Sequence, residues 1–102
     1  MGKRFLIDTN ILIYYLNGTA PTNKEVETAL LDNNFVISSI TFTEILSWKS
    51  LSEDDIQLIT KRFSSIEIIS PDRDISIDAA KIRRTHFVKL ADAIIAASAI
   101  HL

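Results

Sequence analysis

A chain of 102 residues, 47% of them hydrophobic, is long enough for one domain with a buried core. The absence of cysteine excludes disulfides, thiolate zinc sites and cysteine nucleophiles. A net charge of −2 argues against a strongly basic nucleic-acid coat protein, and two glycines, Gly2 and Gly18, provide no glycine-rich phosphate loop.

In the first half of the chain, short apolar runs alternate with helical patterns. We expect a strand at residues 5–7, a helix at 11–16 and a strand at 35–38. A capping box at residues 22–25 predicts a further helix that ends near residue 32. This alternation is typical of an α/β fold with a parallel sheet.

The second half continues the same pattern. A second capping box at residues 41–44 predicts a helix to about residue 50, and residues 52–55 cap the next one. A strand at 66–69 follows, then helices at 75–85 and 91–100. The last helix is apolar nearly all round, so we expect it at the centre of the fold. The predicted fold class is a three-layer α/β/α domain with a central parallel sheet.

Three acidic residues, Asp8, Glu44 and Asp92, stand where a strand ends or a helix begins. Each has a structural explanation: Asp8 as a helix cap, Glu44 as the third residue of a capping box, and Asp92 as a first-turn acid favoured by the helix dipole. Together they are less ordinary, because strand ends and the following helix starts share one edge of a parallel sheet. Carboxylates gathered there repel one another, which favours a bound Mg²⁺ or Mn²⁺.

The segments around these acids resemble the three signature stretches of the PIN domain family. They are LIDTNILI at residues 6–13, TFTEI at 41–45 and LADAIIAA at 90–97. Their order and spacing also match, and the resemblance covers essentially the whole chain. It is closest to the small bacterial VapC-type toxins.

The resemblance implies a Mg²⁺- or Mn²⁺-dependent endoribonuclease, the toxin of a toxin–antitoxin pair, usually a homodimer held inactive by an antitoxin protein. The catalytic and metal-binding acids then fall on Asp8, Glu44 and Asp92. The auxiliary polar positions fall on Thr9 and Asn10. The family normally has one more strand and a fourth acid after the alanine-rich helix. We therefore expect residues 1–102 to form a single PIN-like domain that is incomplete at its C-terminus.

The basic stretch KIRRTHFVK at residues 81–89 immediately precedes Asp92. Such a run is usually a solvated helix face, but this one ends at the edge that carries the acids. That makes the cations of the stretch candidates for contacts with an RNA backbone. These candidates are Arg83, Arg84 and Lys89.

The aromatic residues and histidines are given structural interpretations. Phe87 could stack on a base, but core packing is the favoured interpretation. We expect His86 and His101 to be solvated surface groups. The aromatic side chains expected in the core or at an interface are Tyr14, Tyr15 and Trp48.

The location and the alternative functions complete the sequence predictions. The lack of cysteine fits a cytoplasmic protein, and the longest apolar run, residues 93–100, is too short to span a bilayer. A haloacid-dehalogenase-like phosphatase would need a second Asp where the chain has Asn10. The serious rival is a truncated or degenerate PIN scaffold without catalysis that binds a protein partner.

Overall fold

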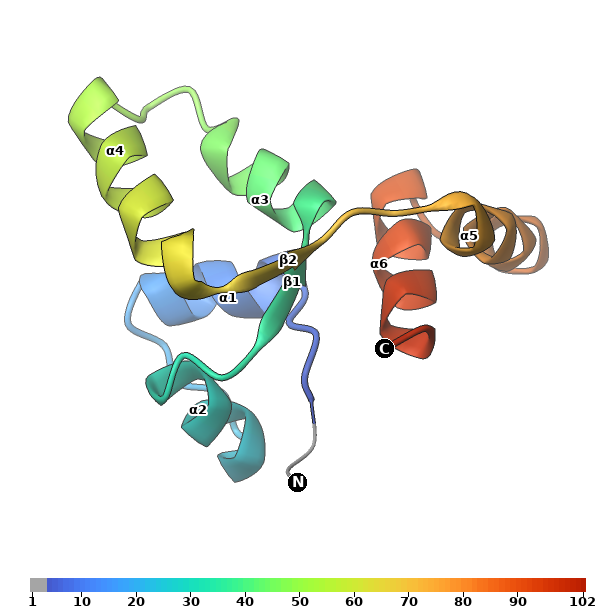
Figure 1. Ribbon diagram of the computed structural model, residues 1–102, viewed down its shortest axis with the longest axis horizontal. Helices are drawn as coiled ribbons and strands as arrows, with labels where there is room; N and C mark the ends of the chain where they lie inside the picture. Colours follow the sequence, from blue (N-terminus) through green and yellow to red (C-terminus); the bar gives the residue numbers. More distant parts are fainter. Residues whose placement is uncertain (1–3) are drawn as a thin grey trace.

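The computed structural model describes residues 4–102, which form an α/β fold on short parallel strands (Figure 1). Strand β1 (Val36–Ser38) pairs in parallel with β2 (Glu67–Ile69), and Ile37 stands opposite Ile68. All three residues of β1 are buried, whereas β2 is more exposed. The predicted α/β class with a parallel sheet is confirmed.

The predicted strand at residues 5–7 joins the other side of β1 at a single point. Leu6 and Val36 form an isolated parallel bridge. The Ile7 N–H donates to the Val36 carbonyl at 2.9 Å, and the Val36 N–H donates to the Phe5 carbonyl at 2.8 Å. Strand β1 is therefore paired on both sides.

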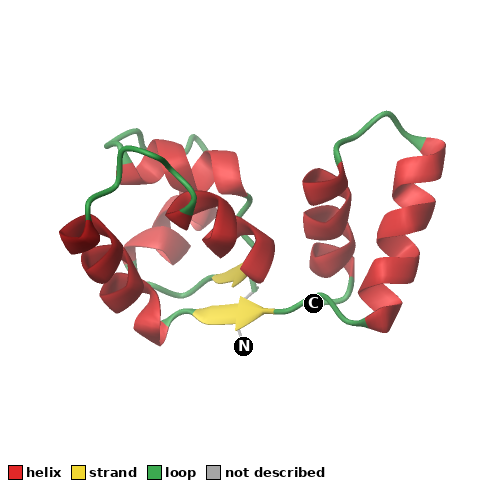
Figure 2. Cartoon of the chain, turned by 90° about the horizontal axis from the view of Figure 1, so that it is seen from above, coloured by secondary structure: helices red, strands yellow, loops and turns green. Residues whose placement is uncertain are grey.

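Helices pack against these strands and extend beyond them. Helices α1 to α4 gather around the strands, while α5 and α6 form an antiparallel pair beyond the C-terminal end of β2 (Figures 1 and 2). No helix within residues 4–102 is long and apolar enough to cross a membrane. The helices are α1 (Thr9–Leu16), α2 (Lys24–Leu31), α3 (Ser39–Leu46), α4 (Glu53–Arg62), α5 (Arg73–Thr85) and α6 (Leu90–Ile100), with a 3-10 turn η1 (Phe63–Ser65) after α4.

Helix α3 begins directly where β1 ends. The hydroxyl of Ser38, the last residue of β1, accepts a hydrogen bond from the Ile40 N–H at 3.1 Å and caps the helix. The predicted capping box at residues 41–44 is therefore wrong, and the helix ends at Leu46 rather than near residue 50. Because the helix starts early, Thr41 lies inside it and is fully buried.

Two other helix starts test the same capping rule. At α4 the Asp55 N–H donates to the Ser52 hydroxyl and the Ser52 N–H donates to the Asp55 carboxylate, which forms a complete capping box. The bond from the Ser52 N–H, and then the Ser52 side chain, lower the pKa of Asp55. At α2 the cap is Asn23 rather than Thr22, so the box predicted at residues 22–25 is wrong.

The apolar interior falls into two groups. A smaller group lies between α5 and α6 and consists of Ile75, Ala79, Ala93 and Ala97. The main group surrounds β1 and contains side chains from the elements up to β2. Its buried members are Ile7, Leu12, Leu30, Phe35, Ile37, Ile45, Phe63 and Ile66.

Helix α6 is buried over most of its circumference, but it packs on α5 away from the main core. Ala93 and Ala97, one turn apart, are fully buried, and their small side chains allow close packing on α5. Ile95, on the side opposite Ala93, is also buried, whereas Leu90 and Ile100, at the two ends of the helix, are 57% and 71% exposed. The prediction that this helix lies at the centre of the fold is therefore wrong.

Replacing Ile37 by alanine should lower the free energy of unfolding by about 2–5 kcal/mol, because the side chain is fully buried at the centre of the main core. The matched control is Ile77→Ala on α5, where the side chain is 59% exposed and the change should stay within about 0.5 kcal/mol. Urea denaturation followed by circular dichroism measures both. Equal losses of stability would contradict the central position of β1.

Candidate active site

The three acids predicted to lie together line one cavity of about 470 Å³. Asp8 precedes α1, Glu44 lies on α3 and Asp92 lies in the first turn of α6. Three elements that are distant in the sequence therefore supply one carboxylate each. The other residues that line the cavity are Thr9, Asn10, Ile13, Thr43, Ser47, Trp48, Lys89 and Ala91.

Asp8 has a structural role in addition to its place in the cavity. Its Oδ1 accepts a hydrogen bond from the Ile11 N–H at 2.8 Å and caps α1. Within residues 4–102 this is the only hydrogen bond that the Asp8 carboxylate accepts, so its second oxygen is available to a ligand. The cap explains the residue type at this position without using the whole carboxylate.

Glu44 does not cap a helix, so the capping-box explanation of this residue is wrong. The Thr9 hydroxyl lies 2.6 Å from Glu44 Oε1 and 3.0 Å from Thr41 Oγ1. A carboxylate only accepts and a hydroxyl has one proton, so Thr9 donates a hydrogen bond to Glu44 and accepts one from the Thr41 hydroxyl. The buried Thr41 thus anchors a short chain of hydrogen bonds that links α1 to α3 and orients Glu44.

Asp92 lies in the first turn of α6, where the helix dipole favours a negative charge. Lys89, the residue directly before the helix, is its N-cap, and no side chain forms a capping hydrogen bond there. Lys89 is also the only cationic residue that lines the cavity within the described chain. Among the described residues 4–102, Lys89 forms no ion pair with Asp8, Glu44 or Asp92, and neither does any other cation there.

The donor atoms suit a hard divalent cation. Carboxylate oxygens are the ligands that Mg²⁺ and Mn²⁺ prefer, and the cavity contains no thiol or imidazole that would favour a softer metal. Within residues 4–102, however, no three His, Cys, Asp or Glu side chains form a group that could hold a metal ion as they stand. The acids share a cavity without forming a closed cluster, and a cation would have to draw them inward.

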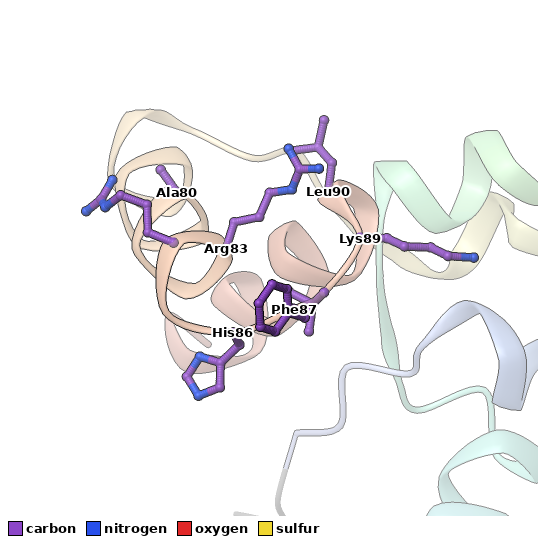
Figure 3. Close-up of a pocket in the computed structure, with 8 residues that line it drawn as sticks. Ala80, Arg83, His86, Phe87, Lys89 and Leu90 are labelled. Atoms are coloured by element: carbon purple, nitrogen blue, oxygen red, sulfur yellow. The ribbon is translucent and has the colours of Figure 1, made fainter.

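The candidate RNA-contact residues are divided between two cavities. Arg83 and Arg84 line a second cavity, of about 750 Å³, at the turn between α5 and α6 (Figure 3). Lys89 lines both cavities. Phe87, for which core packing was predicted, lines the second cavity with a fully exposed ring, so that prediction is wrong.

Trp48 is the site residue that sequence analysis missed. It was predicted to lie in the core or at an interface, but its 38% exposed side chain lines the acidic cavity. Trp48 lies outside α3, directly after the C-cap Ser47, so helical spacing from Glu44 does not place it. The turn that follows the helix brings it beside the acids, and the sequence has no pattern that indicates this position.

Comparison with known proteins bears on the same residues. The PIN domain family matches the chain over residues 5–102. The chain belongs to the PIN domain family. Among solved structures, this PIN domain is similar to a chain of a toxin–antitoxin complex from Klebsiella pneumoniae, with a TM-score of 0.71 and 31% sequence identity. That match covers 96% of this PIN domain and 78% of the other chain. No curated protein matches.

Replacing Thr9 by valine should destabilise this PIN domain by about 1–3 kcal/mol, because the buried Thr41 hydroxyl and the Glu44 carboxylate both lose their partner. The matched control is Thr43→Val, whose exposed hydroxyl bonds only to the Ser39 carbonyl of its own helix and whose replacement should stay within about 0.5 kcal/mol. Urea midpoints measure both variants. A Thr9→Val protein as stable as the control would show that the hydrogen-bond chain does not hold Glu44.

Proposed function

We propose that this PIN domain is a Mg²⁺- or Mn²⁺-dependent endoribonuclease and the toxin of a toxin–antitoxin pair. The observation that carries the proposal is the convergence of Asp8, Glu44 and Asp92, from three separate elements, on one cavity. PIN domains are generally nucleases, and the acids lie in the stretches that resemble the family's signatures. The similarity to a chain of a toxin–antitoxin complex supports the biological role.

In this proposal Asp8, Glu44 and Asp92 are the residues that would hold the cation. The ion, when bound, lowers the pKa of a coordinated water and offsets charge on the scissile phosphate. Neighbouring residues of the chain position the polar groups around the ion. Thr9 holds the Glu44 carboxylate through its 2.6 Å hydrogen bond, and Asn10 supplies a further polar group at the cavity wall.

The cationic side chains near the cavity bind the phosphates of the RNA. Lys89 reaches the cavity itself, and Arg83 and Arg84 lie on the adjoining turn. Neither histidine takes part, because His86 and His101 do not line the acidic cavity. General-base catalysis by histidine is therefore not part of the proposed mechanism.

The proposed partners are an antitoxin protein and a second copy of the chain. A cell that makes a toxic nuclease needs an inhibitor of it, and the similar solved structure is a toxin–antitoxin complex. Helix α1 presents Ile11 and Tyr14, which are 38% and 59% exposed, on a surface that a partner would bury.

The second candidate function is a PIN scaffold without catalysis, which binds a protein partner. The observation that favours it is the open arrangement of the acids, which do not form a group that could hold a metal ion as they stand within residues 4–102. Metal titration separates the two candidates, since only the nuclease requires the acids to close around a cation.

Mn²⁺ should raise the melting temperature of the wild type and not that of Asp8→Asn or Asp92→Asn. At ten times the dissociation constant, binding adds about 1.4 kcal/mol of stability, or roughly 5 °C or more for a domain of this size. Asparagine caps a helix as well as aspartate does, so Asp8→Asn removes the charge and keeps the cap. Differential scanning fluorimetry with and without Mn²⁺ measures the shift.

The matched controls for this experiment are on α5. Asp72 caps that helix through the Ile75 N–H at 2.9 Å, and Asp74 lies in its first turn. Neither residue lines the acidic cavity. Asp72→Asn and Asp74→Asn should therefore keep the full Mn²⁺ response. If all four variants respond as the wild type does, the metal site is wrong, and RNA cleavage that persists in Asp8→Asn would exclude the proposed chemistry.

A further inference from the structure

The turn between α5 and α6 holds an aromatic ring entirely in solvent. Phe87 is 110% exposed, the highest value among the exposed large hydrophobic residues. The Val88 N–H donates to the His86 carbonyl at 3.0 Å, which closes a three-residue turn with Phe87 at its apex. The backbone therefore keeps the ring away from the core (Figure 3). A ring in this position contributes nothing to folding, which points to a role in binding.

The surroundings of Phe87 are strongly basic. The cavity of about 750 Å³ at this turn is lined by Arg83, Arg84, His86 and Lys89 and by no carboxylate, although the whole chain has a net charge of −2. None of these arginines or the lysine forms an ion pair within the described residues 4–102. A positive surface on an acidic protein attracts a polyanion locally.

This basic turn is continuous with the acidic cavity. Lys89 lines both cavities, and its side chain extends away from α5 toward the N-terminal half of the chain (Figure 3). Trp48, on the wall of the acidic cavity, presents a second partly exposed aromatic side chain. The order along the surface is thus an aromatic residue beside the acids, a shared lysine, and a second aromatic residue beside two arginines.

We propose that the α5–α6 turn binds single-stranded RNA that continues out of the acidic cavity, with Phe87 stacked on a base and Arg83, Arg84 and Lys89 against phosphates. This inference rests on the proposed function, since it names the strand that the same site would cleave. Exposed aromatic rings beside uncompensated cations are the usual means of binding single strands. Bases in a duplex are already stacked on one another, so a protruding ring has no free base face to contact there.

A protein partner is the competing occupant of this turn. Phe87, Val88 and Leu90 are all exposed and apolar. Protein interfaces are enriched in aromatic residues and in Arg, so the apolar side chains alone do not decide between the two occupants. Three cations and, among the described residues, no carboxylate line this cavity, however, which suits a polyanion. The charges therefore favour RNA.

The stacking role is tested with the whole chain in EDTA, where no divalent ion is present and no cleavage interferes. The probe is a fluorescent single-stranded oligouridylate of about ten nucleotides, and the measurement is fluorescence anisotropy. Phe87→Leu keeps an apolar side chain but removes the aromatic face, and it should weaken binding about fivefold or more. Phe87→Tyr should bind within about twofold of the wild type. Because the ring is fully exposed, neither change disturbs the fold.

The role of the charges is tested by salt dependence. The double variant Arg83→Gln, Arg84→Gln should lower the slope of log affinity against log salt by about 0.7 for each phosphate that the variant no longer neutralises. The matched control is Lys61→Gln, Arg62→Gln, which removes the same charge at the end of α4, on the far side of the molecule from α5 (Figure 1). The control should keep the wild-type slope.

The outcomes separate this inference from the proposed nuclease function. If the wild type cleaves RNA with Mn²⁺ but Phe87→Leu binds oligouridylate as the wild type does, the RNA-binding turn is wrong and the nuclease stands. If binding depends on Phe87 and cleavage is never found, the nuclease is wrong and the turn stands.

Three further results also decide the matter. In the cleavage reaction, Phe87→Leu should raise KM for the oligouridylate, because the variant loses the stacking contact that holds the strand at the turn. Duplex RNA that binds as tightly as the single strand would overturn the inference. So would a Phe87→Ser variant that dissociates an oligomer in light scattering while keeping its RNA affinity, since the turn would then be an interface between copies.

Discussion

The parallel pairing of residues 5–7 with β1 is the constraint on which the candidate site depends. Two backbone hydrogen bonds with Val36, from Ile7 and to Phe5, set the register of this pairing. That register brings the end of the first segment, where α1 begins, beside the end of β1, where α3 begins. A slip of one residue would turn every side chain of the segment to the opposite face. A single bridge thus determines whether Thr9 can reach Glu44 across the two helix starts.

The three acids differ in how strongly they argue for function. Asp8 caps α1 and Asp92 benefits from the dipole of α6, so ordinary helix physics would retain an acid at both positions. Glu44 has no such benefit, because it lies in the second half of α3, past its N-terminal turn. Its carboxylate lines the same cavity as the other two and accepts a hydrogen bond from Thr9. Helix formation therefore gives no reason for an acid at this position, which makes Glu44 the most informative of the three.

The sequence predicted the elements well and their starting residues less well, for a physical reason. The stretch around residues 38–44 contains several serines and threonines, each a competent cap, and local propensity cannot choose among them. Tertiary packing favours the start at Ser39, because Thr41 is then inside the helix, buried and hydrogen-bonded to Thr9 of α1. The position of Phe87 was unpredictable for a related reason. Apolar character favours burial on average, but a tight turn at residues 86–88 keeps the ring outside.

The opposite charges of the two cavities make their shared lysine important. Three carboxylates repel an approaching phosphate, and a divalent cation would offset this repulsion only within the acidic cavity itself. Over longer distances salt screens both cavities, with a Debye length of about 8 Å at physiological ionic strength. The arginines of the turn therefore act mainly on phosphates that touch the turn itself. Their charges can act on the same strand only if that strand touches both cavities, and Lys89 is the residue at which the two surfaces meet. Contact along a continuous surface, rather than long-range attraction, is the physical basis on which an acidic protein of this kind could hold RNA.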